Sequence, residues 1–165
     1  MQNRASRRHV LKAGVILSLA TLAGCMSTKP EKPSGNGGDQ TEATLGYVNA
    51  LRKEKGLPPL SNDPAAAAAA LSQASRMAKA GKMSHLIGMG DSFFDRMKGQ
   101  GVALPAAENI AAGQDDAEGA YQAWYRSPKH LENMLGSSYR GLGVAVVRNP
   151  ASGNRPYWAM VLSAG

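Results

Sequence analysis

The distribution of hydrophobic positions divides the chain into three kinds of segment. Residues 10–23 are mostly apolar, residues 26–40 contain almost no large apolar side chain, and residues 41–165 alternate between apolar and polar positions. This succession is typical of a leader, a flexible linker and one folded domain. The third segment is long enough to bury a single hydrophobic core.

Helical spacing dominates the first part of that domain. Leu45, Val48 and Leu51 recur every three residues, which predicts a helix over 41–55. Asp63 and Pro64 predict the start of a second helix that continues to Gly81, because aspartate caps free amides and proline suits the first turn. Further helices are expected over 91–98 with Phe94 and Met97 inward, after Asp115 and Asp116 with Ala117, Tyr121 and Trp124 on one face, and over 128–135.

The last part of the chain changes to the period of β-strands. Residues 141–147 and 157–163 are strand-like, and a polar loop over 148–156 joins them. Residues 108–112 are a candidate third strand. Helices followed by an antiparallel sheet indicate a layered domain of the α+β class.

Residues 1–24 have the features of an export signal. Leu22-Ala23-Gly24-Cys25 resembles a bacterial lipobox, in which cleavage precedes the cysteine and its thiol is acylated. The apolar run is too short for a membrane span, which needs about 20 residues. We therefore expect a signal peptide over 1–24, a lipidated cysteine and tether over 25–40, and a domain over 41–165. The basic residues that precede or interrupt the apolar run are Arg4, Arg7, Arg8 and Lys12.

The export route stays open at this stage. Residues 6–12 resemble a twin-arginine signal, although Val10 stands where phenylalanine is usual, and a basic leader also contains paired arginines by chance. Met26, rather than aspartate, follows the cysteine. In a Gram-negative cell this resembles lipoproteins that are released to the outer membrane.

Charge and cysteine content exclude several function classes. The whole chain carries a net charge of +7, but residues 1–24 hold four basic residues and no acid, which leaves +3 on the remainder. That balance, without a dense basic run, gives no case for nucleic-acid binding. Cys25 is the only cysteine, so with its thiol acylated the domain has no disulfide, cysteine nucleophile or cysteine-based zinc site.

Five strings that span most of residues 42–163 occur in a characteristic order. They are Val48-Asn49-Ala50-Leu51-Arg52 with Gly56-Leu57-Pro58-Pro59-Leu60; Met83-Ser84-His85; Ala107-Glu108-Asn109-Ile110-Ala111; Trp124 with Ser127-Pro128-Lys129-His130-Leu131-Glu132-Asn133-Met134-Leu135; and Gly141-Leu142-Gly143-Val144-Ala145. Together they resemble the CAP superfamily (cysteine-rich secretory, antigen-five and pathogenesis-related-one proteins) in its short bacterial, SCP-like form. The resemblance implies an α-β-α sandwich with a small central antiparallel sheet flanked by helices.

The resemblance also implies a cleft lined by histidines and acidic residues, where some members bind divalent cations. The matching residues are His85, Glu108 and His130, and the cleft-supporting residues are Ser84, Asn109, Trp124 and Asn133. Two imidazoles and a carboxylate suit zinc or a similar ion with one open position. They equally suit a satisfied polar network without metal.

Local chemistry adds two expectations about this cleft. His130 lies near a helix start, where the partial positive charge disfavours an imidazolium. Ser84 beside His85 does not by itself predict a nucleophile, because catalysis also needs an orienting group and an oxyanion site. The late strand reads Pro156-Tyr157-Trp158-Ala159-Met160. Bacterial relatives often have Trp-Thr-Gln there, so we expect this cleft to lack the threonine and glutamine side chains of those relatives.

Three functions follow as hypotheses. The first is a lipid-anchored envelope module that binds a lipid, a cell-wall fragment or a protein without catalysis. The second is a metal-dependent hydrolase that uses the same histidines and glutamate to hold an ion and activate water. The third is a purely structural envelope protein.

Overall fold

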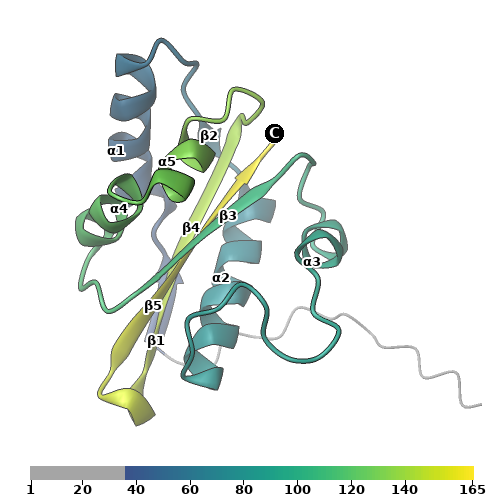
Figure 1. The fold of residues 1–165 in the computed structure, drawn as a ribbon, viewed down its shortest axis with the longest axis vertical. Helices are drawn as coiled ribbons and strands as arrows, with labels where there is room; N and C mark the ends of the chain where they lie inside the picture. The colour runs from purple at the N-terminus through teal and green to yellow at the C-terminus, as the bar shows by residue number, and fades with distance from the viewer. Residues whose placement is uncertain (1–35) are drawn as a thin grey trace, which may run out of the picture.

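A central β-sheet between two layers of helices forms the domain (Figure 1), in a computed structural model that describes residues 36–165. This confirms the predicted α+β sandwich. The helices are α1 (Thr41–Glu54), α2 (Pro64–Ala80), α3 (Phe93–Gly99), α4 (Ala117–Tyr125) and α5 (Pro128–Met134). The strands are β1 (Asn36–Asp39), β2 (Ser61–Asn62), β3 (Ala107–Ala112), β4 (Gly141–Asn149) and β5 (Arg155–Ser163), with a 3₁₀ turn at Pro150–Ser152 between β4 and β5.

The sheet places β3 at one edge. Its strand order is β1-β4-β5-β3 with antiparallel neighbours, and the short β2 pairs in parallel with the start of β4. In the part of the chain that the structure describes, β3 pairs only with β5, so its outer edge remains free of other strands. Side chains from the neighbouring helical layers can therefore meet at that edge.

Both faces of the sheet are buried, because the apolar side chains of β5 point alternately to one face and to the other. On one face, Trp158, Met160 and Leu162 join a cluster with residues of α1, α4 and α5. On the other, Tyr157, Ala159 and Val161 join a cluster with residues of α2 and α3. Strand side chains point alternately to the two faces, so one continuous apolar strand serves two cores.

Helix α2 lies close to the sheet because its inward side chains are small. Its alanines pack against β4 and β5, and Gly143 of β4 directly faces the backbone of Ala67. The predicted cap at the start of this helix is confirmed, since the Asp63 carboxylate accepts a hydrogen bond of 2.9 Å from the amide of Ala65. The helix ends at Ala80 and is capped by Gly81, whose φ of +61° favours glycine.

Helix α3 differs from its prediction in start and orientation. It begins at Phe93, after Ser92 caps it, rather than at residue 91. Met97 is buried as expected, but the inward prediction for Phe94 is wrong, since this side chain is 54% exposed. Phe93 packs against the α2-side core instead. The physical reason is that residues four apart share a helix face, which pairs Phe93 with Met97.

The domain also begins earlier than predicted. Residues 36–39, assigned above to the tether, form β1 and pair with β4 from Asn36↔Arg148 to Asp39↔Ala145. The expected boundary at residue 41 is therefore corrected. The predicted signal peptide, Cys25 and the rest of the tether lie outside the described residues. Among residues 36–165, no helix combines the length and the apolar character needed to cross a bilayer.

The approach of α2 to β4 gives a direct test of the packing. Gly143→Ala would place a Cβ 2.0 Å from the backbone nitrogen of Ala67, so we expect a loss of about 3 kcal/mol in the free energy of unfolding, measured by chemical denaturation. The control is Gly46→Ala on the exposed side of α1, where no atom lies within 4 Å. It should gain about 0.5–1 kcal/mol. Equal stabilities for the two variants would contradict this account.

Candidate functional site

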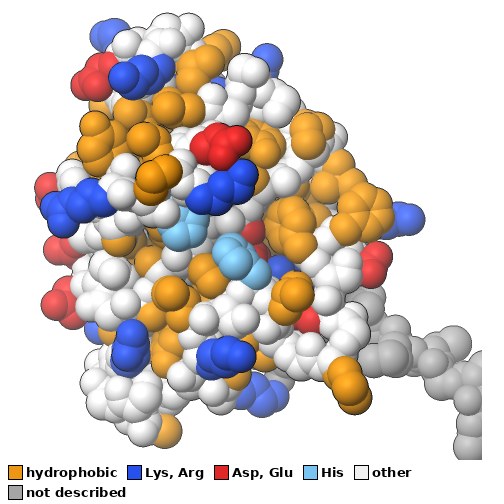
Figure 2. Space-filling model, in the orientation of Figure 1, with side chains coloured by type: hydrophobic (Ala, Val, Ile, Leu, Met, Phe, Trp, Pro, Cys, Tyr) orange, Lys and Arg blue, Asp and Glu red, His pale blue; other side chains and the backbone are white. Residues whose placement is uncertain are grey.

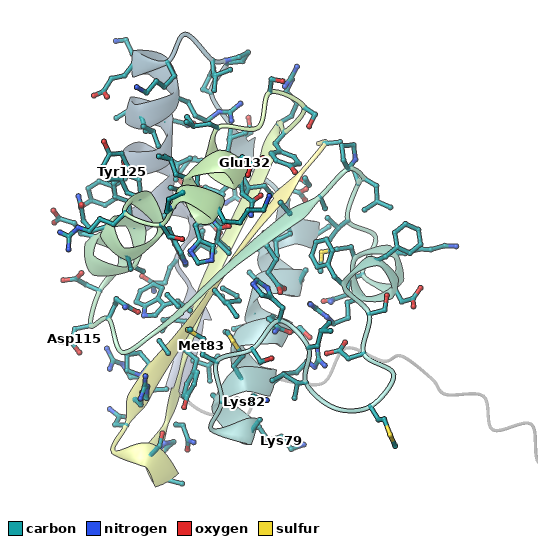
Figure 3. The ribbon with its side chains drawn as sticks, viewed as in Figure 1. Lys79, Lys82, Met83, Asp115, Tyr125 and Glu132 are labelled. Atoms are coloured by element: carbon teal, nitrogen blue, oxygen red, sulfur yellow. The ribbon has the colours of Figure 1, made fainter. Side chains whose placement is uncertain are left out.

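The loop that carries His85 is held against α2 by a buried glutamine. This loop begins with Lys82 and Met83, which lie beside the end of α2 (Figure 3). The side-chain amide of Gln73 is fully buried and donates to the backbone carbonyls of Ser84 at 2.8 Å and His85 at 3.2 Å. These bonds fix the backbone around His85 and so position its ring.

An aspartate whose side chain is only 6% exposed anchors the far end of the same loop. The carboxylate of Asp91 accepts a 2.6 Å hydrogen bond from the amide of Ile87 and pairs with the guanidinium of Arg76. Nε of Arg96 lies 3.3 Å from its other oxygen, as an ion pair without a hydrogen bond. Burial acts to raise the pKa of Asp91, but the bonds from Arg76 and Ile87 and the charges of both arginines outweigh it, so the pKa lies below its ordinary value.

Glu108 is the centre of the site, and its carboxylate is fully engaged. It lies on β3 with a side chain that is only 1% exposed. Arg96 of α3 donates from Nη1 to Oε2 at 2.9 Å and from Nη2 to Oε1 at 3.2 Å, a two-pronged pairing. Nδ1 of His85 lies 2.9 Å from Oε1. Both oxygens of this buried carboxylate therefore have hydrogen-bond partners.

This pairing sets the tautomer of His85. At neutral pH a glutamate carboxylate only accepts hydrogen bonds, so we infer that Nδ1 of His85 carries the proton and donates it to Glu108. In the neutral ring, Nε2 is then the acceptor. The side chain of His85 is 49% exposed, so the ring is fixed at its Nδ1 side and accessible to solvent over about half of its surface.

The next residue of β3 positions the second histidine from the opposite face of the sheet. Asn109 is fully buried, and its amide donates to the backbone carbonyl of His130 at 3.0 Å. Its oxygen accepts a 2.8 Å hydrogen bond from Asn133. Two hydrogen bonds thus hold α5 against the edge strand. Because neighbouring strand residues point to opposite faces, Glu108 and Asn109 serve the two helical layers separately.

The two histidines line one pocket of about 320 Å³ at this edge. Figure 2 shows them next to one another near the middle of this face of the molecule. The lining residues are His85, Phe93, Ala107, Glu108, Lys129, His130 and Asn133. The ammonium of Lys129 lies 2.9 Å from the carboxylate of Glu132, which Figure 3 labels on α5. This ion pair is exposed and is worth little energetically.

The environment of His130 changes its pKa. Its pKa is lowered from the ordinary value of 6.5, first by burial and second by the nearby charge of His85. The lowering of this pKa agrees with the expectation from the sequence, and burial and the neighbouring His85 are its causes in the structure. At neutral pH the ring of His130 is uncharged.

The predicted site residues do not fit a three-ligand metal centre. His85, Glu108 and His130 line the same pocket, yet among residues 36–165 no three His, Asp or Glu side chains are arranged to hold a metal ion. At Glu108, Arg96 already donates hydrogen bonds to both carboxylate oxygens. No catalytic step through a metal follows from this arrangement.

Of the residues predicted to support the cleft, the two asparagines do so in the structure, whereas the serine and the tryptophan do not line the pocket. Asn109 and Asn133 support the pocket as expected of them. Ser84 does not line it, and its hydroxyl donates to the carbonyl of Leu86 at 2.9 Å. Trp124 of α4 is fully buried in the core and does not line the pocket. The sequence interpretation missed Arg96, whose role depends on α3 approaching β3, a contact that no local pattern indicates.

The family model described as "Cysteine-rich secretory protein family", CAP, matches residues 45–162. The uncharacterized protein YkwD of Bacillus subtilis is 33% identical over 103 residues, which is 62% of this chain and 40% of that protein. The chain thus spans about two-fifths of the length of this curated relative.

Solved structures share the fold. An extracellular protein containing a SCP domain from Bacillus anthracis is 27% identical with a TM-score of 0.66, over 74% of this chain and 39% of its own. An outer surface protein from Borrelia burgdorferi is 20% identical with a TM-score of 0.67, over 79% and 98% of the two chains. At that identity the second likeness shows the fold alone.

The lowered pKa of His130 predicts a pH dependence of stability. Below pH 6.5 the unfolded chain binds a proton that the folded chain resists, so the free energy of unfolding falls as pH drops through 6.5. His130→Gln removes this contribution. We expect the stability advantage of wild type over the variant to shrink between pH 8 and pH 5, measured by thermal denaturation across that range. If the stabilities of wild type and His130→Gln instead change with pH by the same amount, the lowered pKa does not belong to His130.

Proposed function

Because the chain belongs to the cysteine-rich secretory protein family, CAP, we propose that it is an exported, lipid-anchored envelope protein that binds a ligand without catalysis in the pocket beside β3. The observation that carries this proposal is the state of Glu108, whose oxygens are bonded by Arg96 and His85. A carboxylate held in this way is poorly placed to act as a general base or a metal ligand.

The lining of the pocket supports recognition rather than bond cleavage. Among its described lining residues there is no serine, threonine or cysteine that could act as a nucleophile. Phe93 and Ala107 supply apolar surface, and His85, His130 and Asn133 supply hydrogen-bonding groups. Apolar walls with a few polar groups are typical of small-ligand pockets. This chemistry suits an envelope ligand that has both apolar and uncharged polar parts, in a lipid, a cell-wall fragment or a protein.

Location outside the cytoplasm is supported by the leader and by similar proteins. The Leu22-Ala23-Gly24-Cys25 string resembles a lipobox, and the similar proteins of known structure are named as extracellular or outer surface proteins. A lipid on Cys25 would tether the domain to the membrane, and to the outer membrane in a Gram-negative cell. The membrane and the envelope ligand are the proposed partners.

The ligand proposal is tested by thermal stability in the presence of defined probes. We would add purified peptidoglycan fragments or detergent-dispersed envelope phospholipids to the protein and measure its melting temperature. A ligand at 100 times its Kd stabilises the folded state by about 2.7 kcal/mol, which gives a clear rise in melting temperature. His85→Ala combined with His130→Ala should remove this rise.

The matched control is Gln122→Ala on α4, a half-buried polar residue that lines a separate surface hollow. It should keep the full rise in melting temperature. If the double histidine variant keeps the rise as well, the ligand binds elsewhere. If no probe changes the melting temperature of the wild type, the proposed ligand classes are wrong.

The anchor is tested separately by Cys25→Ser. Without the thiol no acyl chain can be attached, so the protein should move from the membrane fraction to the soluble fraction after cell disruption and centrifugation. Incorporation of labelled palmitate should disappear in the same variant. Retention in membranes with wild-type abundance would contradict the lipoprotein assignment.

A further inference from the structure

The loop between α2 and α3 carries a group of large apolar side chains that face solvent. Leu86 is 53% exposed, Met89 is completely exposed, and Met83 and Phe94 are exposed on either side of them. These are four of the seven large hydrophobic side chains that are exposed in residues 36–165. Single exposed apolar side chains are ordinary, whereas a group of them on one short segment is typical of an interaction surface.

Hydrogen bonds hold the backbone of this loop in place. The buried amide of Gln73 donates to the two carbonyls of residues 84 and 85, and the carboxylate of Asp91 accepts from the amide of Ile87. Ile87 packs against the core on the α2 side, while its neighbour Leu86 is exposed. The exposure of the apolar side chains is therefore a fixed feature of the fold.

We propose that residues 82–90, named here the docking loop, contact the surface of a phospholipid bilayer directly, beside the lipid anchor. The inference goes beyond the ligand pocket, and it rests on the proposed function only for the anchor that brings the domain to the membrane. A bilayer suits apolar side chains with basic neighbours, because the apolar groups enter the boundary of the acyl chains while the cations meet the phosphates.

The described chain enters the fold at the same end of the domain as the docking loop. Asn36, the first residue of β1, pairs with Arg148 near the end of β4. Helix α2 starts beside the first residues of β4 and runs along that strand, so its end at Ala80 is level with the end of β4 (Figure 1). Only residues 26–35 separate Cys25 from Asn36, and they span at most about 40 Å. A lipid on Cys25 would thus hold this end of the domain near the bilayer.

Basic side chains lie at this end as well. Lys82 begins the docking loop and is exposed, and Arg155 is exposed at the start of β5. Figure 3 labels Lys82 and Met83 beside the end of α2, and Figure 2 shows Lys and Arg side chains along the lower end of this face. The carboxylate of Asp91, just after the loop, is already paired with Arg76. The basic groups can therefore meet the phosphates of an anionic bilayer.

The docking contact is reversible and depends on the anchor for its occupancy. Even one myristoyl chain holds a protein on membranes only marginally, and three side chains that enter the interface bury less apolar surface than such a chain. The loop alone would therefore not retain Cys25→Ser in the membrane fraction. With the anchor in place, the effective concentration of bilayer at the loop is high, so the contact persists.

The experiment places a dye at the tip of the docking loop in the protein purified with its lipid. Acylation occupies the thiol of Cys25, the only cysteine of the chain, so Met89→Cys supplies a single site for an environment-sensitive NBD dye. The protein is incorporated into vesicles of equal parts phosphatidylcholine and phosphatidylglycerol. We expect the dye emission to shift to shorter wavelength and its quenching by aqueous iodide to fall severalfold.

The matched position for the dye is Leu104→Cys. Leu104 is 42% exposed and lies at the opposite end of the domain, where the neighbouring carbonyl of Ala103 accepts a hydrogen bond from Ala164. A dye at position 104 should keep the emission and the iodide quenching that it shows without vesicles.

Paired substitutions separate the two contributions, with the dye kept at position 89. Leu86→Ser should increase iodide quenching of vesicle-bound protein, whereas Leu104→Ser should leave it unchanged. Lys82→Glu should have the same effect as Leu86→Ser, whereas Lys55→Glu should not. Lys55 is exposed after the end of α1, on the way to β2, which pairs with the start of β4 at the opposite end. Melting temperatures of all variants check that they are folded.

The outcomes that overturn the docking loop are distinct from failure of the proposed function. A dye at position 89 that stays in water in vesicle-bound protein overturns the inference, and so does equal protection at positions 89 and 104. Protection that rises with protein concentration in the absence of vesicles would assign the loop to a second copy of the chain instead.

Failure of the anchor would be recognised separately, as a thiol of Cys25 that still reacts with maleimide. The same dye measurement on the chain with Cys25→Ser, mixed with a large excess of vesicles, then decides whether the docking loop contacts the bilayer. Absence of any ligand among the lipid and cell-wall probes would remove the ligand proposal and leave the dye result intact.

Discussion

The alternation of side chains at the free edge of β3 is the constraint on which the site depends. Because Glu108 and Asn109 are neighbours on a strand, one points toward the α2 and α3 layer and the other toward the α4 and α5 layer. The first fixes the ring of His85, and the second fixes the backbone of His130. Two distant segments thereby meet in one pocket. A strand inside the sheet would have its edge covered by another strand.

The burial of Glu108 has consequences that reach as far as α2. Its charge is balanced by Arg96, which also contacts Asp91, and Asp91 is in turn held by Arg76 of α2. Two carboxylates and two guanidiniums thus form one balanced network between α2, α3 and β3. The same groups bond the carbonyls of His85 and Ile87, so the loop between α2 and α3 is tied to this network through its backbone. The two arginines that balance the carboxylate charges are therefore the same groups that hold the loop in position.

Periodicity predicted most of the helices and the long strands because those elements bury one or both faces in regular patterns. It could not predict β1, since Asn36–Asp39 has no large apolar side chain and resembles a linker. That strand is held by backbone pairing with β4. Gly37 lies so close to β4 that a Cβ at this position would come 2.6 Å from the side chain of Val147. The resemblance predicted His85, Glu108 and His130, but a charged residue on a short helix gives no signal of its partner. Arg96 acquires its role only when α3 approaches β3 in the folded domain.

The balance of charge in the network also limits what the pocket can recognise. With Glu108 neutralised by Arg96 and Lys129 paired with Glu132, the lining offers little net charge to a ligand. Burial and the neighbouring His85 keep His130 uncharged at neutral pH, because protonation would place a positive charge in a partly desolvated position beside a second ring. What remains for a ligand is apolar surface, ring nitrogens and an amide. Such a surface discriminates by shape and hydrogen bonding, and an uncharged polar group fits it at lower desolvation cost than an ion does.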